Sequence, residues 1–145
     1  MKKISAVLAA ILIYSSAFAI DTAAYTTEEN INGVIVVDDI NSASKISRLS
    51  ISGKKATCKS TYSDRNSNIS YVKIEQTLEK STFGLFFGVS GTNWSKTVYS
   101  DYAVYTNSKA NLECGTYRLK TVFTVKTKDG KTETITVYSD EKTVK

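Results

Sequence analysis

Apolar and polar residues alternate along most of the chain after residue 45, which is the period of a half-buried β-strand. The alternation is strong over residues 71–79, where Val72, Ile74 and Leu78 share one face, and over residues 117–125. Gln76 interrupts the apolar face, and a buried amide there needs hydrogen-bond partners. No segment has a convincing helical period. The pattern therefore predicts an all-β sandwich or barrel.

Turn residues divide this region into seven expected strands. They cover residues 49–51, 56–62, 71–79, 94–100, 102–107, 117–125 and 132–138. The pair Asp129 and Gly130 is typical of a tight hairpin between the last two. A β-branched run at residues 34–37 predicts one more short strand, ended by Asp38 and Asp39. We expect a single antiparallel β-sandwich of about seven strands over residues 45–145.

The N-terminus has the pattern of a secretory signal peptide. Lys2 and Lys3 precede an apolar run over residues 4–14, and small residues follow at Ala17 and Ala19. The alternatives are a membrane anchor or a buried helix, but a spanning helix needs roughly 20 apolar residues. We expect cleavage after Ala19 and secretion, with no transmembrane segment in the mature chain. Residues 20–44 then form a polar tail, partly flexible, and the sequence does not decide whether it joins the fold.

Charge argues against a nucleic-acid partner. Removing residues 1–19 lowers the formal charge from +5 to +3, because this segment holds two lysines and no acid. The remaining lysines are interleaved with acids and hydroxyl residues. This distribution favours a solvated surface over a stripe that follows phosphates, and it leaves a weak attraction to an anionic cell wall open.

The chain contains two cysteines, Cys58 and Cys114. Oxidising conditions outside the cell favour a disulfide, and two cysteines allow one intramolecular pairing. We therefore expect a Cys58–Cys114 disulfide that stabilises the domain by about 4 kcal/mol. The alternative is two buried free thiols.

Residues 112–117 have the spacing of a tyrosine corner. A leucine lies five positions and a glycine two positions before Tyr117, which opens a strand. In immunoglobulin-like and fibronectin-like sandwiches this hydroxyl group bonds back to the chain. A true immunoglobulin domain has its second cysteine two residues after this tyrosine, where this chain has Leu119.

The chain resembles a family of short secreted proteins of Gram-positive bacteria, which is catalogued only as a domain of unknown function. The resemblance is carried by residues 51–58, 72–80 and 114–120 and by Trp94. The resemblance covers roughly residues 45–140. It implies an immunoglobulin-like β-sandwich without an established activity, and the insert at residues 83–91 fits the family pattern least.

The residue content argues against an enzyme. Histidine is absent, which removes the commonest general base near neutral pH and the commonest metal ligand. Glu75 and Glu79 share a strand face, but four residues of strand separate them by about 13 Å, too far for a glycosidase pair. No calcium-loop or phosphate-loop spacing occurs. We expect no catalytic residue, metal site or cofactor.

Two features predict a binding surface. Residues 83–89 are apolar where a loop between strands is normally polar, and exposed patches of this kind mark interaction sites. The alternative is a buried strand or a flap over the core. The second feature is the aromatic series Trp94, Tyr99, Tyr102 and Tyr105, which suits glycan or peptide contact but equally suits a core. The candidate contact residues are Phe83, Leu85, Phe86, Phe87 and Trp94.

The sequence thus predicts a secreted, non-catalytic binding module whose partner is unknown, with a surface glycan or an extracellular protein as possibilities. Two alternatives stay open. One is a secreted hydrolase that acts on cell-wall material with carboxylates assembled only by the fold. The other is a membrane-active, bacteriocin-like protein that inserts the apolar segment at residues 83–89.

Overall fold

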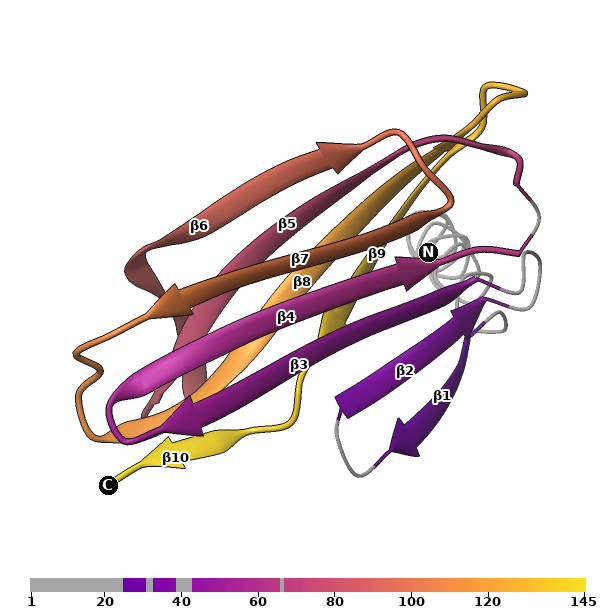
Figure 1. The fold of residues 1–145 in the computed structure, drawn as a ribbon. Coiled ribbons are helices and arrows are strands. Elements are labelled where there is room, and N and C mark those ends of the chain that lie inside the picture. Colours follow the sequence, from indigo (N-terminus) through magenta and orange to yellow (C-terminus); the bar gives the residue numbers. More distant parts are fainter. Residues whose placement is uncertain (1–24, 31–32, 39–42, 66) are drawn as a thin grey trace, which may run out of the picture.

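The computed structural model describes residues 25–30, 33–38, 43–65 and 67–145. Within them the chain forms two antiparallel β-sheets that face each other as a sandwich (Figure 1). None of these residues belongs to a helix long and apolar enough to cross a membrane. The predicted signal peptide lies outside the described residues.

The first sheet has the strand order β1-β2-β3-β4-β7. Its strands are β1 (Tyr25–Asn30), β2 (Gly33–Asp38), β3 (Ser44–Ser52), β4 (Lys55–Ser63) and β7 (Tyr102–Lys109). The predicted strand at residues 34–37 lies within β2, which pairs with β3 from Ile35↔Ile46 to Val37↔Ser44. Of the segment predicted to be a tail, residues 20–44, the structure describes β1, β2 and residues 43–44. The other residues of that segment lie outside the described part.

The second sheet has the order β10-β8-β5-β6, and β9 pairs with β8 as well. Its strands are β5 (Ile69–Thr82), β6 (Leu85–Val98), β8 (Gly115–Thr127), β9 (Thr132–Tyr138) and β10 (Lys142–Val144). All seven strands expected after residue 45 are present. Two details differ: β6 begins at Leu85 rather than Trp94, and the short β10 follows β9.

The core consists of two apolar clusters with a polar layer between them. One cluster contains Tyr62, Ile74 and Phe123, and the other contains Cys58, Leu78 and Leu119. On three central strands the inward residue between the clusters is polar: Ser60 on β4, Gln76 on β5 and Thr121 on β8, each at most 1% exposed.

The polar layer is fully hydrogen-bonded. The Gln76 amide nitrogen donates to Ser60 Oγ at 2.7 Å and to the Tyr105 carbonyl at 3.1 Å, and its oxygen accepts from Asn107 Nδ2 at 2.8 Å. Thr121 Oγ1 lies 2.8 Å from Ser60 Oγ and 2.9 Å from Ser47 Oγ. The expectation that a buried Gln76 finds partners is confirmed, and these bonds join the two sheets.

The predicted tyrosine corner is also present. Tyr117 is 2% exposed, and its hydroxyl group donates to the Glu113 carbonyl oxygen at 2.8 Å. Leu112 is buried in the same apolar cluster. The corner therefore fixes the connection from β7 to β8 as the chain passes from the first sheet to the second.

The predicted disulfide is absent, so that expectation is wrong. Cys58 and Cys114 are both free. Cys58 points inward from β4 and is fully buried in an apolar cluster, whereas Cys114 is exposed in the connection just before β8. The number of cysteines and the predicted export favoured a bond, but the two side chains face different environments.

Candidate functional site

The apolar segment at residues 83–89 begins at the tip of the β5–β6 hairpin. Thr82 pairs with Leu85, so Phe83 and Gly84 are the two turn residues, with φ angles of 53° and 80°. Two positive φ angles are typical of a type I′ turn, which prefers asparagine, aspartate or glycine. A phenylalanine there is unusual, because a left-handed backbone costs a residue with a side chain about 1–2 kcal/mol.

Three side chains at this end of the hairpin are exposed. Phe83 is 102% exposed, Leu85 63% and Phe87 56%. We call these three residues the aromatic tip. Leu85 and Phe87 lie on the same face of β6, two residues apart, and no described strand of the first sheet covers them. Residues 85–89 therefore belong to a strand, but these three side chains are exposed and do not form the buried strand of the alternative interpretation.

Phe86 points to the other face of the hairpin and is half-buried. The Arg118 guanidinium lies between two rings, 4.0 Å from the centre of Phe86 and 4.1 Å from the centre of Tyr138. Arg118 Nε also donates to Glu79 Oε2 at 2.8 Å. This stack fixes the hairpin from its outer face, and it separates Phe86 from the aromatic tip.

A large bulge in β6 sets the direction of the hairpin end. Thr77 pairs with Asn93 and Glu79 with Gly88, so residues 89–92 of β6 face Leu78 alone. At this point the backbone of β6 does not pair with the backbone of Leu78. The fully buried side chain of Thr92 forms the hydrogen bonds to Leu78 instead. Thr92 Oγ1 accepts from the Leu78 amide at 3.2 Å and lies 2.7 Å from the Val89 carbonyl and 3.2 Å from the Leu78 carbonyl.

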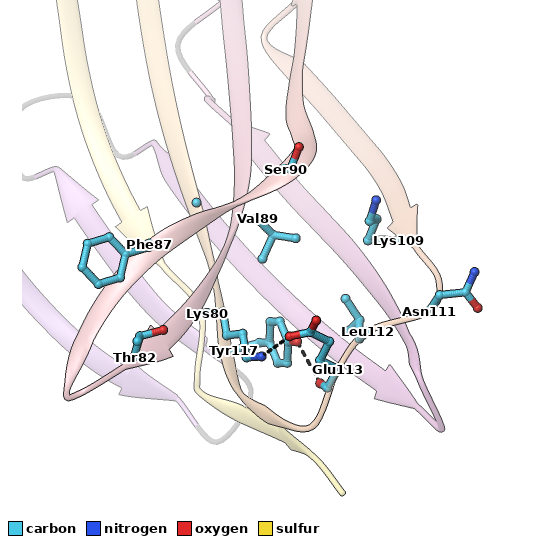
Figure 2. A pocket seen from close by; sticks show the side chains of 11 residues that line it. Lys80, Thr82, Phe87, Val89, Ser90, Lys109, Asn111, Leu112, Glu113 and Tyr117 are labelled. Atoms are coloured by element: carbon cyan, nitrogen blue, oxygen red, sulfur yellow. Dashed lines mark hydrogen bonds and ion pairs between the residues drawn. The ribbon is translucent and has the colours of Figure 1, made fainter.

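A pocket of about 400 Å³ lies between this hairpin and the connection from β7 to β8. Figure 2 shows Phe87 and Val89 on the hairpin side, with Lys109, Leu112 and Glu113 opposite. The volume is in the range of small-molecule sites. The aromatic tip and the pocket share Phe87, so they form one continuous surface.

An ion pair lines the pocket. Lys80 Nζ donates to Glu113 Oε2 at 2.7 Å and lies 5.9 Å from the centre of the Tyr117 ring (Figure 2). This hydrogen bond raises the pKa of Lys80 and lowers the pKa of Glu113. Both groups therefore stay charged near neutral pH, and Lys80 offers little free positive charge to a ligand.

Trp94, the remaining candidate residue, lies apart from the aromatic tip. It follows the bulge, pairs with Gln76 and packs partly buried against the cluster that contains Leu78. Of the aromatic series, Tyr105 packs against the other cluster, whereas Tyr99 and Tyr102 are 79% and 58% exposed. Tyr99 contacts Tyr71 edge to face, with ring centres 6.2 Å apart.

Glu75 and Glu79, the two carboxylates considered for a hydrolase, each form an ion pair with a different basic residue. Glu75 lies 2.8 Å from Lys73, and Glu79 lies 2.8 Å from Arg118. Among the described residues, no group of three or more cysteine, aspartate or glutamate side chains is placed to hold a metal ion.

Sequence reasoning identified the apolar segment but missed Thr92, Arg118 and the pocket. The type I′ turn had a signal in the Gly84 that follows Phe83. The bulge had a weak signal in Gly88 and Gly91, because glycine inside a strand often marks a bulge, but the sequence showed neither its size nor the role of Thr92. No family model matches the chain, and no curated protein matches it.

Proposed function

We propose that the protein is a secreted, non-catalytic binding module that contacts its partner with the aromatic tip and the adjoining pocket. The observation that carries the proposal is Phe83, fully exposed in a left-handed turn position. Neither the exposed ring nor the left-handed backbone of Phe83 stabilises the isolated domain. An apolar ring kept at such a position is explained by contact with something outside the chain.

The rigidity of the hairpin supports the same proposal. Thr92 holds the bulge from inside, and Arg118 holds the outer face against Glu79, Phe86 and Tyr138. A fixed surface binds with a smaller loss of conformational entropy than a mobile loop. The proposal includes secretion, which the signal-peptide pattern supports. It also includes membership of the immunoglobulin-like family of Gram-positive proteins, which the tyrosine corner supports.

The test compares two sets of exposed aromatic residues for binding of the purified protein to intact Gram-positive cells and to isolated cell walls. One variant carries Phe83→Asn and Phe87→Ser, and the matched control carries Tyr102→Ser. Asparagine suits the turn better than phenylalanine, so the fold is retained. We expect binding to fall at least tenfold in the tip variant and to persist in the control. Equal binding by the two variants would contradict the proposal.

A further inference from the structure

We propose that the partner of the aromatic tip is an anionic lipid surface. This inference rests on the proposed function and names the chemistry of its partner. It uses two independent features of the same end of the sandwich: the projecting apolar side chains and the unpaired lysines around them.

The apolar side chains have the geometry of an interfacial anchor. Phe83 is the first residue of the turn, so its ring stands at the far end of the hairpin, and Leu85 and Phe87 follow on one face. The polar outer face, with Arg118 over Phe86, points elsewhere. A bilayer accepts projecting rings without a shaped cavity, since aromatic side chains are favoured at the boundary between lipid tails and headgroups.

The lysines lie at the same end of the molecule. Lys54 lies in the turn between β3 and β4, Lys55 begins β4, and Lys109 ends β7 opposite Ala56. The Leu112 amide donates to the Lys54 carbonyl at 2.9 Å, which ties this turn to the wall of the pocket. Figure 1 shows the β3–β4 turn and the β7–β8 connection at one end of the sandwich.

These three lysines are available to anions. Within the part of the chain that the structure describes, Lys80 pairs with Glu113, but Lys54, Lys55 and Lys109 form no ion pair. Lys109 Nζ lies beside the bulge, 3.7 Å from where a Cβ atom on Gly91 would stand. Each lysine near an anionic membrane surface strengthens binding about fivefold. The charge therefore complements an anionic headgroup layer better than a neutral one.

The experiment measures co-sedimentation of the purified protein with vesicles of phosphatidylcholine alone and of phosphatidylcholine with phosphatidylglycerol. We expect binding to the phosphatidylglycerol vesicles only, weakened by high salt. Phe83→Asn should lower the partition coefficient on the order of tenfold or more, because it removes one inserted ring. The double variant Lys54→Glu and Lys55→Glu should lower it at least as much, and Tyr102→Ser should leave it unchanged.

Three results would overturn the inference: no binding to either vesicle, equal binding to both, or binding that Phe83→Asn leaves intact. Thermal unfolding of each variant checks the fold, and Phe83→Asn should unfold no earlier than the parent protein. If the tip variant loses binding to cells while vesicles are never bound, the lipid partner is wrong and the proposed function stands. If neither cells nor vesicles depend on the tip, both proposals fail.

Discussion

Replacing Thr92 with valine removes the hydroxyl group that closes the β6 bulge while keeping the size and β-propensity of the side chain. The Leu78 amide and carbonyl both point toward β6, but the β6 backbone bulges away over residues 89–92. The Thr92 hydroxyl group accepts from the amide, and its single proton is shared between the Leu78 and Val89 carbonyls. Valine can do neither.

The magnitude follows from burial. Leu78 and Thr92 are both 0% exposed, so water does not replace the lost acceptor. An unpaired buried amide costs about 1–3 kcal/mol, and loss of the donated bond adds about 0.5–1.5 kcal/mol. We expect Thr92→Val to lower the free energy of unfolding by about 2–4 kcal/mol, a large part of the 5–15 kcal/mol typical of a domain.

Urea unfolding measures this change, with Thr92→Ser as the matched control. Serine keeps the hydroxyl group and loses one methyl group, which is worth about 1 kcal/mol. With an m-value of about 2 kcal/mol per molar urea, the valine variant should unfold about 1–2 M urea earlier. Hydrogen exchange at the Leu78 amide gives a local readout, since its protection should fall in the valine variant and persist in the serine variant.

A valine variant at least as stable as the serine variant would contradict this role of the Thr92 hydroxyl group. An unchanged exchange rate of the Leu78 amide in the valine variant would contradict it as well. Either outcome would mean that the Leu78 amide has another partner and that Thr92 does not hold the bulge.

Three other predictions concern the corner and the thiols. Tyr117→Phe removes the hydrogen bond to the Glu113 carbonyl and should lower the free energy of unfolding by about 1–2 kcal/mol, measured by urea unfolding; no change would mean that the corner contributes no stability. Cys114 should react with a thiol reagent in the native protein and Cys58 only after unfolding, so a native count of zero or two would contradict the free-thiol assignment. Burial raises the pKa of the Cys58 thiol from 9.0 to about 12, so the unfolded chain ionises first and stability should fall by about 1.4 kcal/mol per pH unit between these values. Cys58→Ala should flatten that part of the pH profile, and an unchanged slope would rule out this thiol as its source.

Much of the architecture was predictable because strand alternation is a local property. The faces of β5 and β8, the hairpin after β8 and the tyrosine corner each depend on residues close together in sequence. The hairpin turn after β8 spans residues 127–131 with Gly130 at a φ of 92°, consistent with the turn signal of Asp129 and Gly130.

The candidate site was predictable only in part. The sequence of an apolar run such as residues 83–89 does not show whether a second sheet covers it. Its exposure depends on where the first sheet ends. Arg118 and Glu79 alternate as ordinary polar strand residues, and nothing in their local sequence places Phe86 beside them.

The pattern of apolar and polar residues was enough to predict which side of each strand is apolar, where most strands turn, and an all-β sandwich. Which inward residues meet across the sheets depends instead on the three-dimensional fold. It brought Ser60, Gln76 and Thr121 into one polar layer and left Cys58 and Cys114 unpaired. The physical reason is that a period of two specifies a face, whereas partners and exposure depend on strand order, register and a bulge formed between distant segments.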